Sequence, residues 1–294
     1  MNIKILILII SAFIFNSCED KIDVSLDAGV SQLVVDAFVN NLPQKQNIKL
    51  TMSNPYFDNS KANSALGAIV KLRDDNGNTF IFAEESNGNY SYTPNPADSF
   101  CALGRNYELS ITYKGEEFYS NSKVNRVPNI DSIKVRSDPS PFSNTERLRA
   151  EFYSKDFKNT IDNFDFYWVK SSRNDSINTL KNSDIIQDGA FSGDGADGLP
   201  FIQPMRQTIN KSDRTPYFEN DTISMQLISI NSDTYSFLLE VFKQTTNGGL
   251  FATPPANVRT NILNRNTKSI TIPEGWFCVS QVKQAGLRIK KPKK

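Results

Sequence analysis

The fold is decided most clearly by residues 104–113, which read GRNYELSITY. Apolar side chains occupy every second position from Tyr107 to Tyr113, with polar side chains between them. This period of two is typical of a β-strand that buries one face and exposes the other. A turn at Lys114-Gly115 then leads into a second strand-like run at residues 117–120. The stretch therefore predicts an antiparallel hairpin, and the same pattern recurs in both directions along the chain.

Upstream of this hairpin, five further segments alternate in the same way or are rich in β-branched and aromatic residues. They lie at residues 31–39, 46–53, 68–73, 79–83 and 89–92. The dipeptides Asn76-Gly77 and Asn87-Gly88 stand between strands, and both residues of such a pair tolerate the positive φ of a tight turn. Some seven short strands with regularly spaced turns predict an immunoglobulin-like or transthyretin-like β-sandwich over residues 30–127.

Downstream, Pro128 imposes an extended connector, which we interpret as a domain boundary. Residues 128–294 are again mostly strand-like, and strands are predicted at residues 131–136, 147–153, 164–170, 222–230, 276–282 and 286–290. One helix is predicted at about residues 233–246, because apolar residues recur at positions 235, 238, 239 and 242. Residues 171–220 are rich in Ser, Asn, Asp, Gly and Pro and predict a long loop insertion. The predicted fold class is therefore mainly β: a sandwich followed by a second, mostly-β domain.

The first residues have the pattern of an export signal. Lys4 precedes a short apolar run that ends at Asn16, too short to span a bilayer as a helix. Ser17-Cys18 looks like the junction at which bacterial lipoproteins are cut and acylated, although Phe15 stands where such signals usually carry leucine. We expect residues 1–17 to be a signal peptide, Cys18 to carry lipid such as palmitate, and residues 18–29 to form a tether. The alternative is an ordinary secretory peptide with an incidental cysteine.

Composition narrows the range of functions. Residues 1–17 hold one of the 33 basic residues and none of the 32 acidic residues, so the remainder balances at 32 against 32. This balance argues against nucleic acid as a partner.

The chain has no histidine, which removes the commonest general base and the Ser–His and Cys–His nucleophile systems. We expect no enzymatic activity. Cys101 and Cys278 are expected to be separate buried thiols, with a disulfide between them as the alternative.

Two sets of residues are candidates for binding. The acidic, glycine-rich stretch 184–198 offers calcium ligands at Asp188, Asp194 and Asp197, although its spacing fits neither an EF-hand loop nor nonapeptide repeats. A solvated, turn-rich insertion is the alternative, and no other cofactor is expected. Aromatic residues in loops stack on sugars or anchor partners. The candidates of this kind are Tyr56, Phe57, Phe191, Phe201 and Phe251.

Several short motifs follow one another along the chain in an order that is typical of a known family. They lie at residues 17–19, 33–37, 67–70, 129–133, 228–235, 254–262 and 275–277. In this order they resemble the uncharacterised surface or periplasmic lipoproteins of Bacteroidota that accompany TonB-dependent (SusC-like) outer-membrane receptors. Thr260 departs from the pattern, because that family usually carries glycine near this position. The resemblance implies an outer-membrane protein with a receptor as partner, and it supplies no catalytic residues.

Two functional hypotheses follow. In the first, the chain is a non-enzymatic lipoprotein that helps a TonB-dependent transporter to capture its ligand. In the second, it is a surface adhesin or glycan-binding lipoprotein, since β-sandwiches often present loops for binding. Glu19-Asp20, next to the expected anchor, favours the cell surface, with the periplasmic face of the outer membrane as the alternative.

Overall fold

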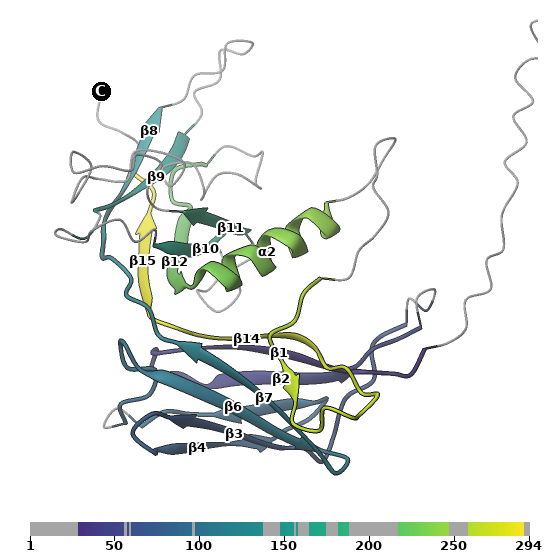
Figure 1. The fold of residues 1–294 in the computed structure, drawn as a ribbon. Helices are drawn as coiled ribbons and strands as arrows, with labels where there is room; N and C mark the ends of the chain where they lie inside the picture. Colours follow the sequence, from purple (N-terminus) through teal and green to yellow (C-terminus); the bar gives the residue numbers. More distant parts are fainter. Residues whose placement is uncertain are drawn as a thin grey trace, which may run out of the picture.

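A computed structural model describes residues 29–55, 58, 60–95, 98–137, 148–155, 157, 165–174, 182–187, 217–246 and 258–290. Within these residues the protein is mainly β with one helix, which confirms the predicted class. A large curled sheet forms the lower layer in Figure 1, and smaller sheets and the helix lie above it. None of the described helices is long and apolar enough to cross a membrane.

The large sheet has nine strands in the order β13-β7-β6-β3-β4-β5-β2-β1-β14. Neighbouring strands are antiparallel except β1 and β14, which are parallel. The strands are β1 (Leu33–Asn40), β2 (Gln46–Met52), β3 (Ile69–Asp74), β4 (Thr79–Glu84), β5 (Asn89–Tyr92), β6 (Asn106–Tyr113), β7 (Glu116–Lys123), β13 (Leu263–Asn264) and β14 (Glu274–Ser280).

One core fills the inside of the curl. As predicted from their spacing, Tyr107, Leu109 and Ile111 are fully buried there, together with alternate residues of β1. The expected sandwich of two separate sheets is not what the chain forms, because hydrogen bonding runs unbroken from β13 to β14. The sheet bends around its own core instead. The bend is easiest at β4, which pairs with β3 at four residues but with β5 at only two.

Strands from the C-terminal part of the chain complete this sheet. β14 pairs with β1 and β13 pairs with β7, so sheet membership crosses the boundary predicted at residues 127–128. The start of β14 requires glycine. Gly275 has φ 96°, and a Cβ at this position would lie 2.0 Å from the carbonyl oxygen of Val35. Local sequence carries no signal for such a long-range parallel pairing.

Side chains rather than a tenth strand cover the outer edge of β14. The Asn261 amide donates to the carbonyl of Phe277 at 2.8 Å and accepts from its N–H at 2.9 Å. Thr260 Oγ1 donates to the carbonyl of Gly275 at 2.9 Å and accepts from the N–H of Ile262. An exposed edge would invite pairing with another chain, and these contacts blunt it. Thr260, where the resemblance predicts glycine, thus has a bonding role of its own.

A second layer packs above β1 and β14. Its four-stranded sheet has the order β11-β10-β12-β15, and a separate pair joins two further strands, β8 and β9. The bounds are β8 (Ile130–Ser137), β9 (Leu148–Ser154), β10 (Phe166–Arg173), β11 (Asn182–Gln187), β12 (Thr222–Ile230) and β15 (Val282–Arg288). Helix α2 (Ser232–Thr245) confirms the predicted helix, and the Asn231 side chain caps it by accepting from the N–H of Thr234.

The insertion predicted at residues 171–220 is not wholly loop. β10 continues to Arg173, and β11 lies inside the predicted insertion and pairs with β10 at six residues. β11 begins with Asn182, Ser183 and Asp184, and only Ile185 and Ile186 are apolar. Its strand conformation therefore depends on pairing with β10 more than on local propensity.

Candidate functional site

The binding residues expected from sequence fall outside the described part of the chain. This applies to the lipidation candidate Cys18, the aromatic candidates Tyr56, Phe57, Phe191, Phe201 and Phe251, and the calcium candidates Asp188, Asp194 and Asp197. They remain predictions. Among the described residues, no group of three or more His, Cys, Asp or Glu side chains is arranged to hold a metal ion.

Cys101 and Cys278 are free thiols, and both are buried. Cys101 belongs to the core inside the curled sheet, and Cys278 belongs to a different cluster, between the two layers. Burial raises the pKa of each thiol. The prediction of two separate buried thiols is confirmed.

A cluster rich in aromatic side chains lies where the two layers meet, and we call it the interlayer seam. Its centre is buried, and aromatic side chains that are only partly buried surround that centre. The seam comprises buried Ile228, Ile230, Leu238, Trp276, Cys278 and Val282, with partly buried Phe38, Leu42, Phe166, Trp168, Ile185, Tyr235 and Phe237. Strand alternation explains the contribution of β10, because Phe166 and Trp168 face the seam while Tyr167 between them faces a second core.

Helix α2 and strand β14 give the seam a rigid floor. The indole N–H of Trp276 donates to Thr234 Oγ1 at 2.9 Å, and both residues are buried. The ring of Phe237 stacks on that of Trp276 with centroids 4.5 Å apart. A buried indole N–H with a partner avoids the cost of an unmade hydrogen bond. These contacts fix the first turn of α2 against the sheet.

Trp168 lies on the opposite wall of the seam. Its ring meets Phe38 of β1 edge to face, with centroids 5.1 Å apart, and its indole N–H donates to Ser183 Oγ of β11. The ammonium of Lys170 lies 3.6 Å from the centroid of the Trp168 ring. A cation over an indole face is attracted to the negative face of the ring. Trp168 is therefore held by three neighbours on three different strands.

A carboxylate stands at the open edge of the seam. The Asp36 side chain of β1 reaches solvent, but protein surrounds it on most sides, and this desolvation raises the pKa of its carboxyl above the ordinary value. The charges of Lys170 and Lys49 act in the opposite direction and lower it. Desolvation likewise lowers the pKa of the Lys170 ammonium, and Asp36 opposes that shift.

Asp36 and Lys170 are coupled by charge without forming a contact ion pair. Among the described residues, no hydrogen bond and no ion pair within 4.0 Å reaches the Asp36 carboxylate. A carboxylate and an ammonium flank the partly exposed rings of Trp168 and Phe38. Such an edge can accept and donate hydrogen bonds to a ligand whose apolar face rests on aromatic side chains.

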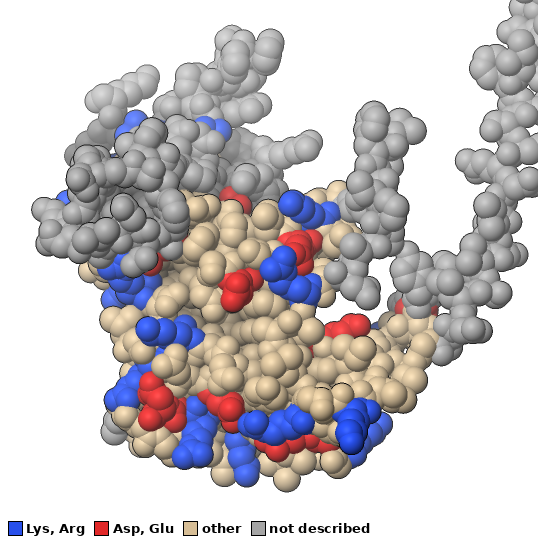
Figure 2. Space-filling view, in the orientation of Figure 1, with Lys and Arg blue, Asp and Glu red and all other residues tan. Residues whose placement is uncertain are grey.

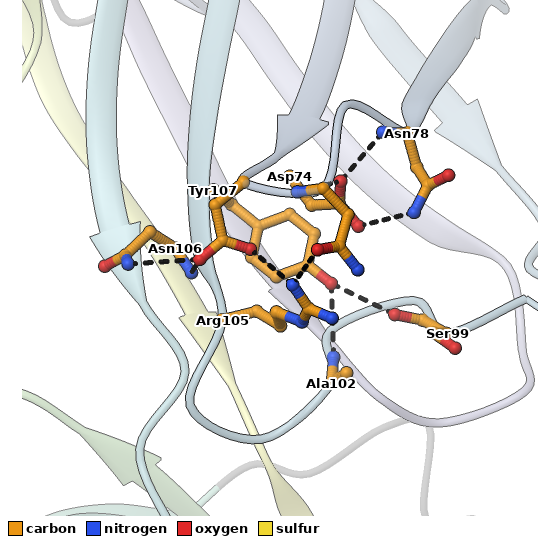
Figure 3. Close-up of polar contacts among 9 residues, drawn as sticks. Asp74, Asn78, Ser99, Ala102, Arg105, Asn106 and Tyr107 are labelled. Carbon is orange, nitrogen blue, oxygen red and sulfur yellow. Dashed lines mark hydrogen bonds and ion pairs between the residues drawn. The ribbon is translucent and has the colours of Figure 1, made fainter.

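Another cluster of polar side chains, shown in Figure 3, finds its hydrogen-bond partners within the chain itself. Asp74, which is buried, accepts from the N–H groups of Asn76 and Asn78 and from the Asn78 amide. Arg105 pairs with Asp75 at 3.1 Å and also donates to Asn76. These bonds close the turn between β3 and β4, so we assign the cluster a structural role.

Charged residues elsewhere are mixed in sign. Figure 2 shows basic and acidic side chains interspersed over the nine-stranded sheet in the lower half of the view. Arg265, for example, lies between Glu108 at 2.9 Å and Glu117 at 2.8 Å. Exposed pairs of this kind contribute at most about 1 kcal/mol each.

The chain belongs to a family described as a domain of unknown function (DUF4249), whose model matches residues 19–285. A comparison with curated proteins found no match.

Asp36 and Lys170 are not among the site residues that the sequence predicts. One signal was available, because Asp36 is the one charged residue of the strand LVVDAFVN and Lys170 follows an aromatic run in FYWVKSSR. A charge within an apolar strand points to an edge or a site. That these two residues meet across the layers depends on tertiary structure and has no local signal.

Proposed function

We propose that this protein is a non-enzymatic outer-membrane lipoprotein, anchored through Cys18, that captures a ligand at the interlayer seam for a TonB-dependent receptor. The single observation that carries ligand capture is the open edge of the seam. There, the carboxylate of Asp36, which pairs with no other described residue, and the ammonium of Lys170 flank the rings of Trp168 and Phe38.

The remaining parts of the proposal have separate supports. The charged start, the short apolar run and Ser17-Cys18 support the lipid anchor. The absence of histidine from the sequence supports a non-enzymatic role. The motif order that resembles receptor-associated lipoproteins supports the receptor as partner.

Purification from solubilised outer membranes tests this proposal. The tagged full chain should recover a TonB-dependent receptor, identified by mass spectrometry of the bound proteins. The matched control Cys18→Ser should lose the receptor, because it removes the site of lipidation and changes none of the described residues. Repeated recovery of the intact lipoprotein without any such receptor would count against the accessory role.

A ligand at the seam has its own readout, because the chain has only two tryptophans. Trp276 is buried on the floor and Trp168 lies at the edge, so ligand binding should change the fluorescence of Trp168. Periplasmic extract fractionated by size serves as the probe. The variant Trp168→Phe should abolish the change and Asp36→Asn should weaken it, whereas Asp75→Asn at the β3–β4 turn should leave it intact.

Glycan binding is the second candidate, and the partly exposed rings of Phe38 and Trp168 favour it, since sugars stack on aromatic faces. Soluble oligosaccharides that bind the full chain in the absence of a receptor, with loss of binding in Trp168→Ala, would favour this role over an accessory one.

A further inference from the structure

The two ends of the nine-stranded sheet differ, and one of them carries an unexplained surface. We call the end at which β1 begins the proximal end and the other the distal end. The strand registers place the starts of β3, β5, β7 and β14 and the ends of β2, β4 and β6 at the proximal end. In Figure 1 this is the end at which the purple strand β1 begins.

Exposed apolar side chains gather at the proximal end. Of the nine large apolar side chains that are most exposed among the described residues, five lie here: Val30, Leu66, Ile69, Ile270 and Ile272. Three of them flank the start of β1, where Val30 is 60%, Ile270 75% and Ile272 66% exposed. Single exposed apolar residues are ordinary, but a group at one end of a domain marks a surface that contacts something.

The chain holds this group in place. The Gln32 side chain donates to the carbonyl of Val30 at 2.9 Å and accepts from the N–H of Ile272 at 2.7 Å, so it ties the two segments together. Between Ile270 and Ile272, the N–H of Thr271 donates to Ser269 Oγ, and Ser269 in turn donates to Glu116. The polar groups of the loop are thus bonded inward, and the isoleucines project outward.

The position of the anchor indicates what covers this surface. Val30 lies twelve residues after Cys18, and an extended chain spans at most about 3.6 Å per residue, so the tether reaches about 43 Å. A lipid on Cys18 therefore keeps Val30, at the proximal end, within about 43 Å of a bilayer. Exposed Lys114 and Lys268 belong to the same end, in the β6–β7 turn and in the loop before β14, together with exposed Glu274 at the start of β14. Lysine beside apolar side chains is the composition that suits the headgroup region of a membrane.

We infer that the proximal end lies on the bilayer, with Val30, Ile270 and Ile272 inserted at the boundary between headgroups and acyl chains. This inference rests on the lipid anchor of the proposed function and goes beyond it, because an anchor alone leaves the orientation of the folded region open. The distal end would then point away from the membrane.

Site-specific fluorescence tests the orientation. Cys101 and Cys278 are buried, so a new surface cysteine can be labelled selectively with an environment-sensitive dye. The label is placed at the proximal end through Val30→Cys or Ile270→Cys and, as a matched control, at the distal end through Leu103→Cys, which is 61% exposed in the native chain. The acylated full chain is reconstituted in vesicles of phosphatidylethanolamine and phosphatidylglycerol that carry nitroxide-labelled acyl chains.

We expect the proximal labels to be quenched several-fold more strongly than the distal label. Adding Ile272→Glu to the Val30→Cys chain should reduce the quenching at position 30, whereas adding Ile81→Glu, on the sheet face away from both ends, should not. Equal quenching at both ends of vesicle-bound protein would overturn the orientation and leave the anchor intact. Failure of the protein to float with vesicles would overturn the anchor and, with it, this inference. A proximal label unquenched by lipid but shielded from aqueous iodide in native membranes would show a protein partner there instead.

Discussion

The two ends of the nine-stranded sheet enclose the same core but meet their surroundings differently. At the distal end, Asp74 is 5% exposed and its carboxylate accepts three hydrogen bonds, while Arg105 and Asp75 complete the closure (Figure 3). At the proximal end, Ile270 and Ile272 point into solvent. A sheet end that only faces water is stabilised by polar turns. The contrast therefore teaches that the chain closes its distal end with its own polar bonds, whereas at the proximal end it leaves a group of apolar side chains uncovered.

The largest expected effect comes from Gly275 at the proximal end. In Gly275→Ala the new Cβ would clash with Val35 in the neighbouring strand, and φ would remain in the left-handed region. β14 should separate from β1, with a loss of about 4 kcal/mol or failure to fold. Gly115→Ala is the control, because Gly115 also has positive φ but a Cβ there meets nothing within 4 Å. It should lose only about 1 kcal/mol. Equal losses in urea unfolding would refute the role of the close approach.

Substitutions in the turn that closes the distal end should also destabilise the fold, by less than Gly275→Ala. Asp74→Ala removes the acceptor of three hydrogen bonds and leaves two backbone N–H groups without it, which should cost about 2–3 kcal/mol. The exposed neighbour Asp75 provides the control, and Asp75→Ala should destabilise less. Thermal unfolding of both variants measures the difference. If Asp74→Ala unfolded like the unmodified chain, the account of the distal end would be wrong.

Asp36 lies midway along β1, between the two ends, and its pKa should depend on the lysines near it. Lys170 lowers the pKa of Asp36 more than Lys49 does, so Lys170→Met should raise that pKa further, and Lys49→Met should raise it less. Carbon-13 NMR titration of the Asp36 carboxyl reads both shifts. Lys45→Met is the control, because Lys45 pairs with Glu85 and should leave Asp36 unchanged.

The same shift has a consequence for stability. The pKa of Asp36 is raised in the folded chain above its ordinary value of 3.8, so ionisation is less favourable folded than unfolded. Asp36→Asn should therefore gain stability relative to the unmodified chain as pH rises through and above 3.8, and show no gain of this origin at lower pH. A gain that is independent of pH would exclude the desolvated carboxylate as its cause.

The smallest effect on stability is expected at the proximal end, where substitution should weaken contact with the membrane the most. The double variant Ile270→Glu with Ile272→Glu changes two side chains that are already in solvent, so unfolding free energy should stay within about 0.5 kcal/mol. Retention of the acylated protein on vesicles should nevertheless weaken. The pair Ile81→Glu with Leu103→Glu supplies the control, with no change in either measurement. A large loss of stability in the proximal variant would mean that these side chains serve the fold.

The sequence predicted local elements well and long-range arrangement poorly. Alternation located β6, and helical spacing located α2, because both signals come from neighbouring residues. The pairing of β1 with β14 joins segments about 240 residues apart, and the curl of one continuous sheet depends on it. Local patterns cannot distinguish that sheet from a sandwich. The candidate site could not be predicted from local patterns either, because Asp36 and Lys170 come from different layers and only the fold brings them together.

The central claim is that lipid on Cys18 holds this β protein at a bilayer, and mass spectrometry of the protein extracted from membranes tests it most directly. The account predicts an N-terminal peptide that begins at Cys18 and carries acyl chains, and no peptide from residues 1–17. A mature chain that starts elsewhere, or an unmodified thiol at Cys18, would contradict it.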